Sequence, residues 1–338
     1  VGAGHDPCAV VQVHIDLPAG ETEEIVFLLG QGADAEEARA LMDRFRTDDA
    51  VEAAWQDGRT FWESLLEIIE VETPDPAMDL LLNRWLLYQA LACRLWGRSA
   101  LYQSGGAYGF RDQLQDVMSL LHADPALARE HILRAARHQF EAGDVLHWWH
   151  PPSGRGVRTR ITDDLLWLPY VTAEYVEATG DAAILDEEVP FRTGEPLAED
   201  EEERYGHYEL TTDAASLYEH CCRALERGTT SGPHGLPLMG SGDWNDGMNR
   251  VGIEGRGESV WLGWFLVAAL KRFADLSEER DDVERAARHR RAEQFRKQAE
   301  ALVEALESQG WDGDWYRRAY YDDGTPLGSA QNRECQID

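Results

Sequence analysis

The chain has 338 residues, 43% of them hydrophobic, which suffices for a sizeable core in one large domain or two smaller ones. Its 63 acidic residues against 32 Lys and Arg give a net charge of -31, which argues against binding to the phosphate backbone of nucleic acids. No apolar run approaches the roughly 18 residues that span a bilayer, which predicts no membrane contact. The five cysteines lack paired metal-ligand spacing and predict reduced thiols in a cytoplasmic protein.

The N-terminal thirty residues have a strand-like pattern that the rest of the chain lacks. Residues 9–17 and 24–29 are rich in β-formers and flank a Pro-Ala-Gly turn, which predicts a β-hairpin. Because a hairpin alone is barely stable, we expect these strands to complete a sheet whose other strands lie upstream. The first residue is Val1 rather than Met, and we therefore interpret the sequence as part of a longer chain.

From about residue 34 onwards, apolar residues recur at helical spacing almost throughout. In the segment 76–97, Asp75 is a candidate N-cap and Gly97 a candidate C-cap. The remaining expected helices are 34–46, 50–70, 111–121, 125–141, 163–179, 211–227, 257–276 and 283–308. Alternate long loops at 98–110, 143–162 and 228–256 predict an α/α toroid with its functional loops gathered at one end.

The first of these loops leads into "GFRDQLQD", where Arg111 and Asp112 open a helix after several glycines. An Arg–Asp pair on a glycine-rich loop can bind sugar hydroxyls, with Asp accepting and Arg donating hydrogen bonds. Helix capping together with a surface ion pair explains the same residues equally well.

The second loop, "VLHWWHPPSGRGVRTRIT", contains no acidic residue in a chain that is otherwise acidic. Its arginines predict a local attraction for an anion such as phosphate; they are Arg155, Arg158 and Arg160. Asp163 and Asp164 follow at the head of the next helix, where acidic residues commonly interact with the helix dipole.

The same loop carries two tryptophans and two histidines. Trp148 and Trp149 offer a face for stacking against sugar, although we expect one of the two indoles to be buried in the core. His147 and His150 have no obvious third ligand nearby, so a metal site is not favoured.

The third loop contains "GSGDWNDGMN", which places Asp243 and Asp246 on either side of Trp244. A calcium loop is not favoured because Met248 occupies the position where that motif requires glycine. Cleavage of a glycosidic bond needs a carboxylic acid to protonate the leaving oxygen. The pattern therefore favours a sugar-cleaving site, but position alone does not say which aspartate is the acid.

Four segments in this order resemble the family 94 glycoside phosphorylases: "GFRDQLQD", "HWWHPPSGRGVRTRITDDLLWLP", "GSGDWNDGMN" and "DDGTPLGSAQNRECQID". This family includes cellobiose phosphorylase, 1,2-β-oligoglucan phosphorylase and the C-terminal region of cyclic β-1,2-glucan synthase. The segments "DPCAVVQ" and "QSGGAYGFRDQLQD" are most similar in sequence to the β-1,2-glucan branch. The resemblance implies a mainly α protein with an (α/α)6 barrel, incomplete at the C-terminus. It further implies sandwich strands in 1–32, a helical linker in 33–70 and the barrel in 71–338.

The resemblance also implies the reaction, reversible phosphorolysis of a β-glucosidic bond with inversion that releases α-glucose 1-phosphate. Phosphate is then a co-substrate that attacks the anomeric carbon directly, and the site needs neither a catalytic base, a metal nor an organic cofactor. By motif, the acid is Asp246. Donor glucose is implied at Trp244 and Asp112, and we add Arg111, Asp243, Trp148, Arg160 and Asp164 as candidate substrate-binding residues.

Two departures from the family pattern affect these expectations. Gly106 occupies the position where the cellobiose-specific branch has an arginine. A preference for cellobiose is therefore not expected, and a β-1,2-glucan or another β-glucoside remains an alternative substrate. The family continues past the position of Asp338, where most phosphate and acceptor ligands are expected, so this stretch alone is not expected to suffice for activity.

Two alternative functions stay open, and the resemblance also bears on the oligomeric state. An inverting hydrolase on a similar barrel would need a second carboxylate roughly 6.5–9.5 Å from the acid to activate water. Its candidates are Asp112, Asp163 and Asp164. A glucan-binding or length-controlling region of a large synthase is the other alternative. The resemblance also makes a homodimer an expected assembly.

Overall fold

The computed structural model describes residues 10–98, 105–151, 153–278 and 285–333. The chain forms two compact units, Val1–Ser64 and Leu65–Asp338. The domain boundaries expected after residues 32 and 70 remain predictions. No helix in the described ranges is long and apolar enough to cross a membrane.

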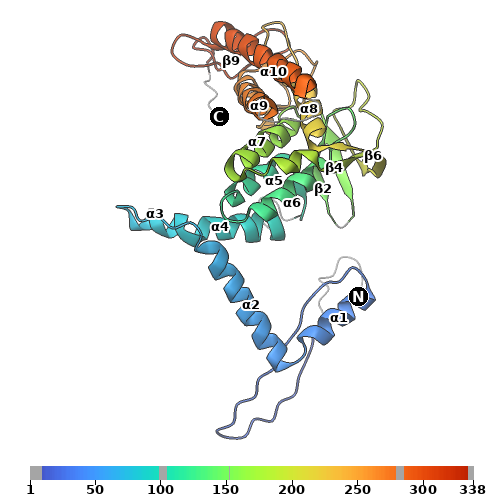
Figure 1. Cartoon of the computed structure of the whole chain (residues 1–338), viewed down its shortest axis with the longest axis vertical. Coiled ribbons are helices and arrows are strands. Elements are labelled where there is room, and N and C mark those ends of the chain that lie inside the picture. Colours follow the sequence, from blue (N-terminus) through green and yellow to red (C-terminus); the bar gives the residue numbers. More distant parts are fainter. Residues whose placement is uncertain (1–9, 99–104, 152, 279–284, 334–338) are drawn as a thin grey trace. The chain divides into compact units, whose positions relative to one another are not determined.

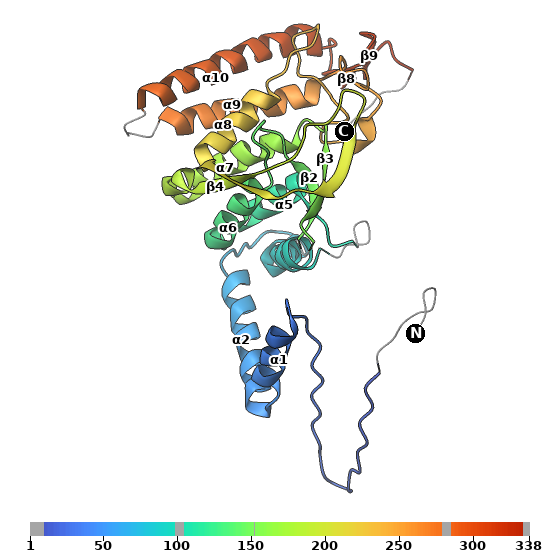
Figure 2. The same ribbon diagram turned by 90° about the vertical axis from the view of Figure 1, so that its right-hand side faces the viewer.

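In the first unit, the turn expected near residue 19 forms, with the Glu21 amide donating to the Pro18 carbonyl at 3.2 Å. The flanking segments are extended and exposed, but residues 10–33 contain no strand (Figures 1 and 2). The expected hairpin ladder is therefore wrong for residues 10–29, because within the described part of the chain the two segments have no hydrogen-bonded partner strand. Two helices follow: α1 (Ala35–Phe45) and α2 (Asp48–Leu66).

In the second unit, residues 76–97 are helical as expected but irregular. They form α3 (Pro76–Leu80), η1 (Leu81–Trp85), α4 (Leu86–Gln89) and η2 (Ala90–Gly97). The Asp75 side chain accepts a hydrogen bond from the Ala77 amide at 2.9 Å, which confirms the predicted N-cap. The left-handed C-cap is Arg98 rather than Gly97.

The remaining helices of this unit alternate with short turns of 3-10 or π-helix. They are α5 (Phe110–Val117), η3 (Met118–Leu120), α6 (Pro125–Ala136), η4 (Asp164–Leu166), α7 (Trp167–Thr179), η5 (Ala182–Asp186), α8 (Leu217–Gly228), η6 (Asp246–Met248), α9 (Val260–Glu278), α10 (Arg285–Ala305) and η7 (Leu306–Gly310). Helix α7 packs between α5 and α9, and α6 and α8 also contact each other. This arrangement in two layers is the one expected for consecutive helix pairs of an α/α toroid (Figure 2).

Three small antiparallel sheets accompany the helices in the described residues. One contains, in order, β1 (Tyr108–Gly109), β2 (Leu146–His150), β3 (Arg155–Thr159) and β5 (Glu203–His207). The second pairs β4 (Glu188–Arg192) with β6 (Leu210–Ser216), and the third contains β7 (Glu258–Ser259), β8 (Ala319–Tyr320) and β9 (Pro326–Leu327). Strands β2, β3 and β8 lie toward one end of the helix layers in Figure 2.

The strand β6 corrects the helix expected over 211–227. Residues 210–216 pair with β4, and α8 begins only after Ser216, whose hydroxyl accepts a hydrogen bond from the Glu219 amide. Thr211 and Thr212 favour an extended backbone, and the hydrogen bonds to β4 outweigh the weak helical pattern of this segment.

Candidate active site

The N-terminal ends of α5, α7 and α9 bring together most of the polar residues singled out by the sequence. Arg111 lies in the first turn of α5, Asp163 and Asp164 precede α7, and Ser259 precedes α9. Helix N-termini carry a partial positive charge, so this is a favourable place to collect carboxylates. The chain supplies five there: Asp112, Asp163, Asp164, Asp243 and Asp246.

Gly109 allows the "GFRD" segment to form this helix start. A β-carbon at Gly109 would lie 2.5 Å from Oδ2 of Asp112, so only glycine lets the Asp112 side chain fold back over the first turn. Asp112 is half-buried in this position.

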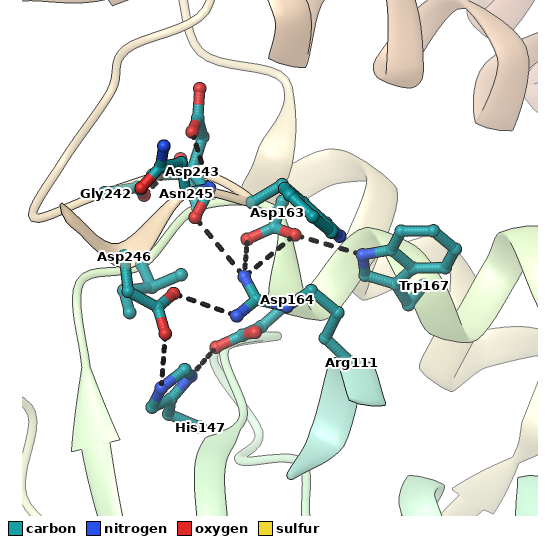
Figure 3. Close-up of polar contacts among 12 residues, drawn as sticks. Arg111, His147, Asp163, Asp164, Trp167, Gly242, Asp243, Asn245 and Asp246 are labelled. Carbon is teal, nitrogen blue, oxygen red and sulfur yellow. Dashed lines mark hydrogen bonds and ion pairs between the residues drawn. The ribbon is translucent and has the colours of Figure 1, made fainter. Parts of the chain in front are cut away.

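Arg111 is the hub of the cluster (Figure 3). Its Nη1 donates to both carboxylate oxygens of Asp163 at 3.2 and 3.3 Å and to the carbonyl of Asp243 at 3.3 Å. Its Nη2 donates to Oδ1 of Asp246 at 2.9 Å. Burial alone would lower the pKa of Arg111, but Asp163, Asp164 and Asp246 raise it above its ordinary value, so the guanidinium stays charged.

Asp163 is completely buried beneath this hub. Burial, and next the charge of Asp164, raise its pKa to about 7, while Arg111 and a 3.0 Å hydrogen bond from Nε1 of Trp167 oppose the shift. Both carboxylate oxygens of Asp163 are occupied by hydrogen bonds from Arg111 and Trp167.

His147, on β2, lies between a buried and an exposed carboxylate. Its Nδ1 is 2.8 Å from Oδ2 of Asp164, and its Nε2 is 3.7 Å from Oδ2 of Asp246 (Figure 3). Burial would lower the pKa of His147, but Asp164 and then Asp246 outweigh it and raise the pKa to about 9. His147 is therefore an imidazolium at neutral pH, although the sequence argument did not assign it to the site.

The surroundings of Asp243 indicate a structural role rather than contact with a ligand. Its carboxylate is fully buried and is held by two hydrogen bonds of 2.7 Å from the guanidinium of Arg318. The hydroxyl of Ser259 donates a third at 2.6 Å, and the Asn245 amide a fourth at 3.1 Å. This carboxylate anchors the start of α9 and the β8 segment to the loop.

Asp246 lies on the same loop but is half-exposed, with 52% of its side chain accessible. Met248, two residues later, enters a small core with Met239, Val251 and Ala319, which fixes the loop beneath the carboxylate. The loop therefore fixes the position of Asp246 while its carboxylate stays accessible. Arg111 lies near Oδ1 and His147 near Oδ2.

The aromatic candidates lie apart from one another. Trp244 is 46% exposed and its Nε1 donates to Gln115 of α5 at 3.4 Å. Trp148 is half-buried on β2, with its ring centroid 5.6 Å from that of Tyr205. Trp149 is buried and stacks on His138, which confirms that one of the two indoles belongs to the core.

The arginines of the acid-free loop mostly bind protein groups. Arg158 is buried and forms a bidentate pair with Asp144. Arg160 is exposed and donates to the carbonyls of Ala198 and Glu201. Arg160 lines a cavity of about 760 Å³ together with Thr162 and Asn249, and none of the five clustered carboxylates lines it. The structure therefore does not bring Arg160 into the Asp246 cluster.

Within the described ranges, no three His, Cys, Asp or Glu side chains are grouped as a metal site would require. The carboxylates of the cluster are instead matched by cationic side chains, Arg111, His147 and Arg318. Chemically, the arrangement offers the half-exposed Asp246 carboxylate for proton transfer beside an exposed indole, while Asp112 keeps a half-buried carboxylate.

The chain matches two family models of carbohydrate-active enzymes over most of its length. Residues 61–338 match the catalytic domain of the glycosyl hydrolase 94 superfamily, and residues 1–48 match its supersandwich domain. The chain belongs to this family, whose catalytic domain is an (α/α)6 barrel. Residues 10–33, extended here, are therefore part of the supersandwich region.

Among curated proteins, the chain is 47% identical over 334 residues to the cyclic β-(1,2)-glucan synthase NdvB of Rhizobium meliloti (strain 1021). It is 30% identical over 337 residues to the 3-O-β-D-glucopyranosyl-β-D-glucuronide phosphorylase of Paenibacillus borealis, and 30% identical over 338 residues to the solabiose phosphorylase of the same organism. These alignments cover 98%, 98% and 100% of this chain. The chain spans 12% of the length of the synthase and 40% of the length of each phosphorylase.

Proposed function

We propose that this chain carries the general acid of an inverting β-glucoside phosphorylase. In this reaction a phosphate oxygen attacks the anomeric carbon, the bond to the leaving oxygen breaks, and Asp246 gives its proton to that oxygen. The products are α-glucose 1-phosphate and a shortened sugar. The observation that carries the proposal is the accessible Asp246 carboxylate in a cluster where Asp163, Asp164 and Asp243 are buried.

The roles of the neighbouring residues follow from their surroundings. Trp244 offers an exposed indole two residues from the acid, which suits stacking against a pyranose ring. Asp112 keeps a half-buried carboxylate that can accept from sugar hydroxyls, and Trp148 remains a candidate aromatic contact. Arg111 orients the acid. Asp243 and Arg160 use their polar atoms within the protein, so we give them no direct contact with sugar.

Burial of two of the three candidate bases weighs against an inverting hydrolase and supports phosphorolysis. An inverting hydrolase needs a second carboxylate that reaches a water molecule on the opposite face of the sugar. Asp163 is buried against Arg111 and Trp167, and Asp164 is buried against His147, so neither is placed to activate water. Of the three candidates, only Asp112 keeps any exposure.

The 47% identity to a cyclic glucan synthase favours a β-1,2-glucan as the sugar and allows a second role. In that role the region would act within a synthase, using phosphorolysis to trim the growing glucan. The retained acid loop supports an active site in either protein. A phosphate-dependent release of glucose 1-phosphate is expected from both.

The test uses the full-length protein that contains these residues. It is incubated with sophorose, longer β-1,2-glucans or cellobiose, each with and without inorganic phosphate, and α-glucose 1-phosphate and free glucose are assayed. We expect α-glucose 1-phosphate only with phosphate, with the β-1,2-linked sugars responding best. Glucose released equally without phosphate would establish a hydrolase instead.

A further inference from the structure

His147 connects the accessible acid to the buried part of the cluster. Its two ring nitrogens face two carboxylates, Nδ1 toward Asp164 at 2.8 Å and Nε2 toward Asp246 at 3.7 Å. Figure 3 shows the ring below Asp246 and beside Asp164, while Arg111 contacts the other oxygen of Asp246. The ring is 17% exposed, so the contact is partly shielded from water.

The charge on this ring follows from the groups that face it. Burial disfavours the imidazolium, and Arg111 on α5 also opposes it. Asp164 in η4 and Asp246 in η6 outweigh both, and the pKa rises to about 9. Asp163 lies beyond Arg111 and is matched by that guanidinium rather than by His147. His147 therefore presents a fixed positive charge to Asp246 over the neutral range.

The second oxygen of Asp164 supports a functional reason for this arrangement. Its Oδ1 is buried and has no hydrogen-bond partner among the described residues. A half-satisfied buried carboxylate is costly, and a neutral side chain would fill the space at lower cost. The negative charge of Asp164 raises the pKa of His147 and so keeps its ring protonated.

We infer that His147, held by Asp164, is a positioning residue that fixes Oδ2 of Asp246 and places a positive charge beside the carboxylate that exchanges its proton with the glycosidic oxygen. This inference rests on the proposed function, because it names how that acid is controlled. Phosphorolysis needs Asp246 protonated, whereas synthesis from glucose 1-phosphate needs its carboxylate as the base. His147 holds Oδ2 of Asp246 in either direction, so its loss should slow both reactions.

The test measures pH–rate profiles of His147→Gln in the full-length protein, in both directions. Glutamine keeps a hydrogen-bond donor and removes the charge. In wild type we expect both rate profiles to have an alkaline limb near pH 9, where the His147 ring loses its charge, and in His147→Gln we expect both of these limbs to be lost. kcat should fall about tenfold or less, with KM for the sugar nearly unchanged.

Two further variants separate charge from packing. His207→Gln removes an exposed imidazole on β5 that pairs with Glu209, and it should leave both limbs in place. Asp164→Asn keeps the shape but removes the charge that holds His147 protonated. Its profile should match wild type at low pH and that of His147→Gln at high pH.

A measurement without turnover distinguishes failure of the inference from failure of the proposed function. NMR titration of the His147 ring should show a lower midpoint in Asp246→Asn than in wild type, because the two charges are coupled. Phosphorolysis that keeps its alkaline limb in His147→Gln and no coupling by NMR would overturn the inference alone. Coupling by NMR without phosphate-dependent activity would overturn the proposed function alone.

Discussion

Asp243 and Asp246 lie three residues apart in the same loop, yet their carboxylates meet opposite surroundings. Asp243 is fully buried and is paired with Arg318 through two hydrogen bonds. Asp246 keeps 52% of its side chain accessible. The sequence predicted that the loop contains an acid. Position in the loop could not separate the two residues, because Arg318 lies 75 positions along the chain and nothing in the local pattern identifies it as a partner. Only the motif resemblance assigned the acid to Asp246.

Asp243→Ala tests the structural role of the buried carboxylate. The substitution leaves the Arg318 guanidinium buried without its ion-pair partner, which costs about 3–5 kcal/mol of unfolding free energy. Urea unfolding followed by tryptophan fluorescence measures this loss. Asp246→Ala is the matched control and should change stability by less than about 1 kcal/mol. Equal losses in the two variants would contradict the different roles given to them.

The raised pKa of His147 also predicts how stability depends on pH. The ring has a pKa of about 9 when folded against 6.5 ordinarily, so the native protein keeps a proton that the unfolded chain loses between these values. The stabilisation is complete below about pH 6.5, is lost as pH rises to about 9, and amounts to about 3 kcal/mol at most. Thermal unfolding from pH 6 to 9.5 should show this slope in wild type and in His207→Gln. An unchanged slope in His147→Gln would contradict it.

The loop that carries Asp246 depends on glycine at one point of close contact. Gly240 has a φ of +62°, and a β-carbon there would lie 2.2 Å from the carbonyl oxygen of Arg160. The loop is therefore pressed against the chain that follows β3. The short Met239–Met248–Val251 core then fixes the far side of the loop.

Gly240→Ala should therefore displace the acid loop. We expect kcat for phosphorolysis to fall at least about tenfold, because an error of about 1 Å in placing a catalytic group costs this much or more. Gly255→Ala is the control: φ is +79° there too, but no atom lies within 4 Å of the added carbon. It should cost about 1 kcal/mol of backbone strain and leave kcat unchanged. Equal activities in the two variants would show that the contact does not hold the acid.

Helices were more predictable from sequence than strands. The periodicity of residues 125–141 and 257–276 comes from packing on one apolar face, and α6 and α9 form there. Strands β2 and β3 were missed because their short segment reads as a loop rich in glycine and proline. They pair with each other, and their outer edges pair with β1 and β5, which no local pattern shows. The hairpin at residues 9–29 was expected from propensity, but residues 10–29 pair with no strand that the structure describes.

At the scale of the whole molecule, the site is made by the convergence of three helix N-termini. Arg111 contacts Asp163, 52 residues away, and Asp246, 135 residues away. The sequence predicted that functional loops gather at one end, and motif resemblance pointed to Asp246. It did not predict His147 as a member of the cluster, since its link to Asp164 exists only once β2 lies beside the start of α7.

The most direct test of the central claim compares two substrates in the full-length Asp246→Asn variant, with phosphate present in both. Sophorose has a sugar leaving group that needs a proton, whereas 2,4-dinitrophenyl β-glucoside has a leaving group that departs without one. If Asp246 is the acid, kcat should fall by about 10²–10⁴ with sophorose and by less than about tenfold with the dinitrophenyl glucoside. Similar losses with both substrates, or no loss with sophorose, would contradict the assignment of Asp246 as the general acid.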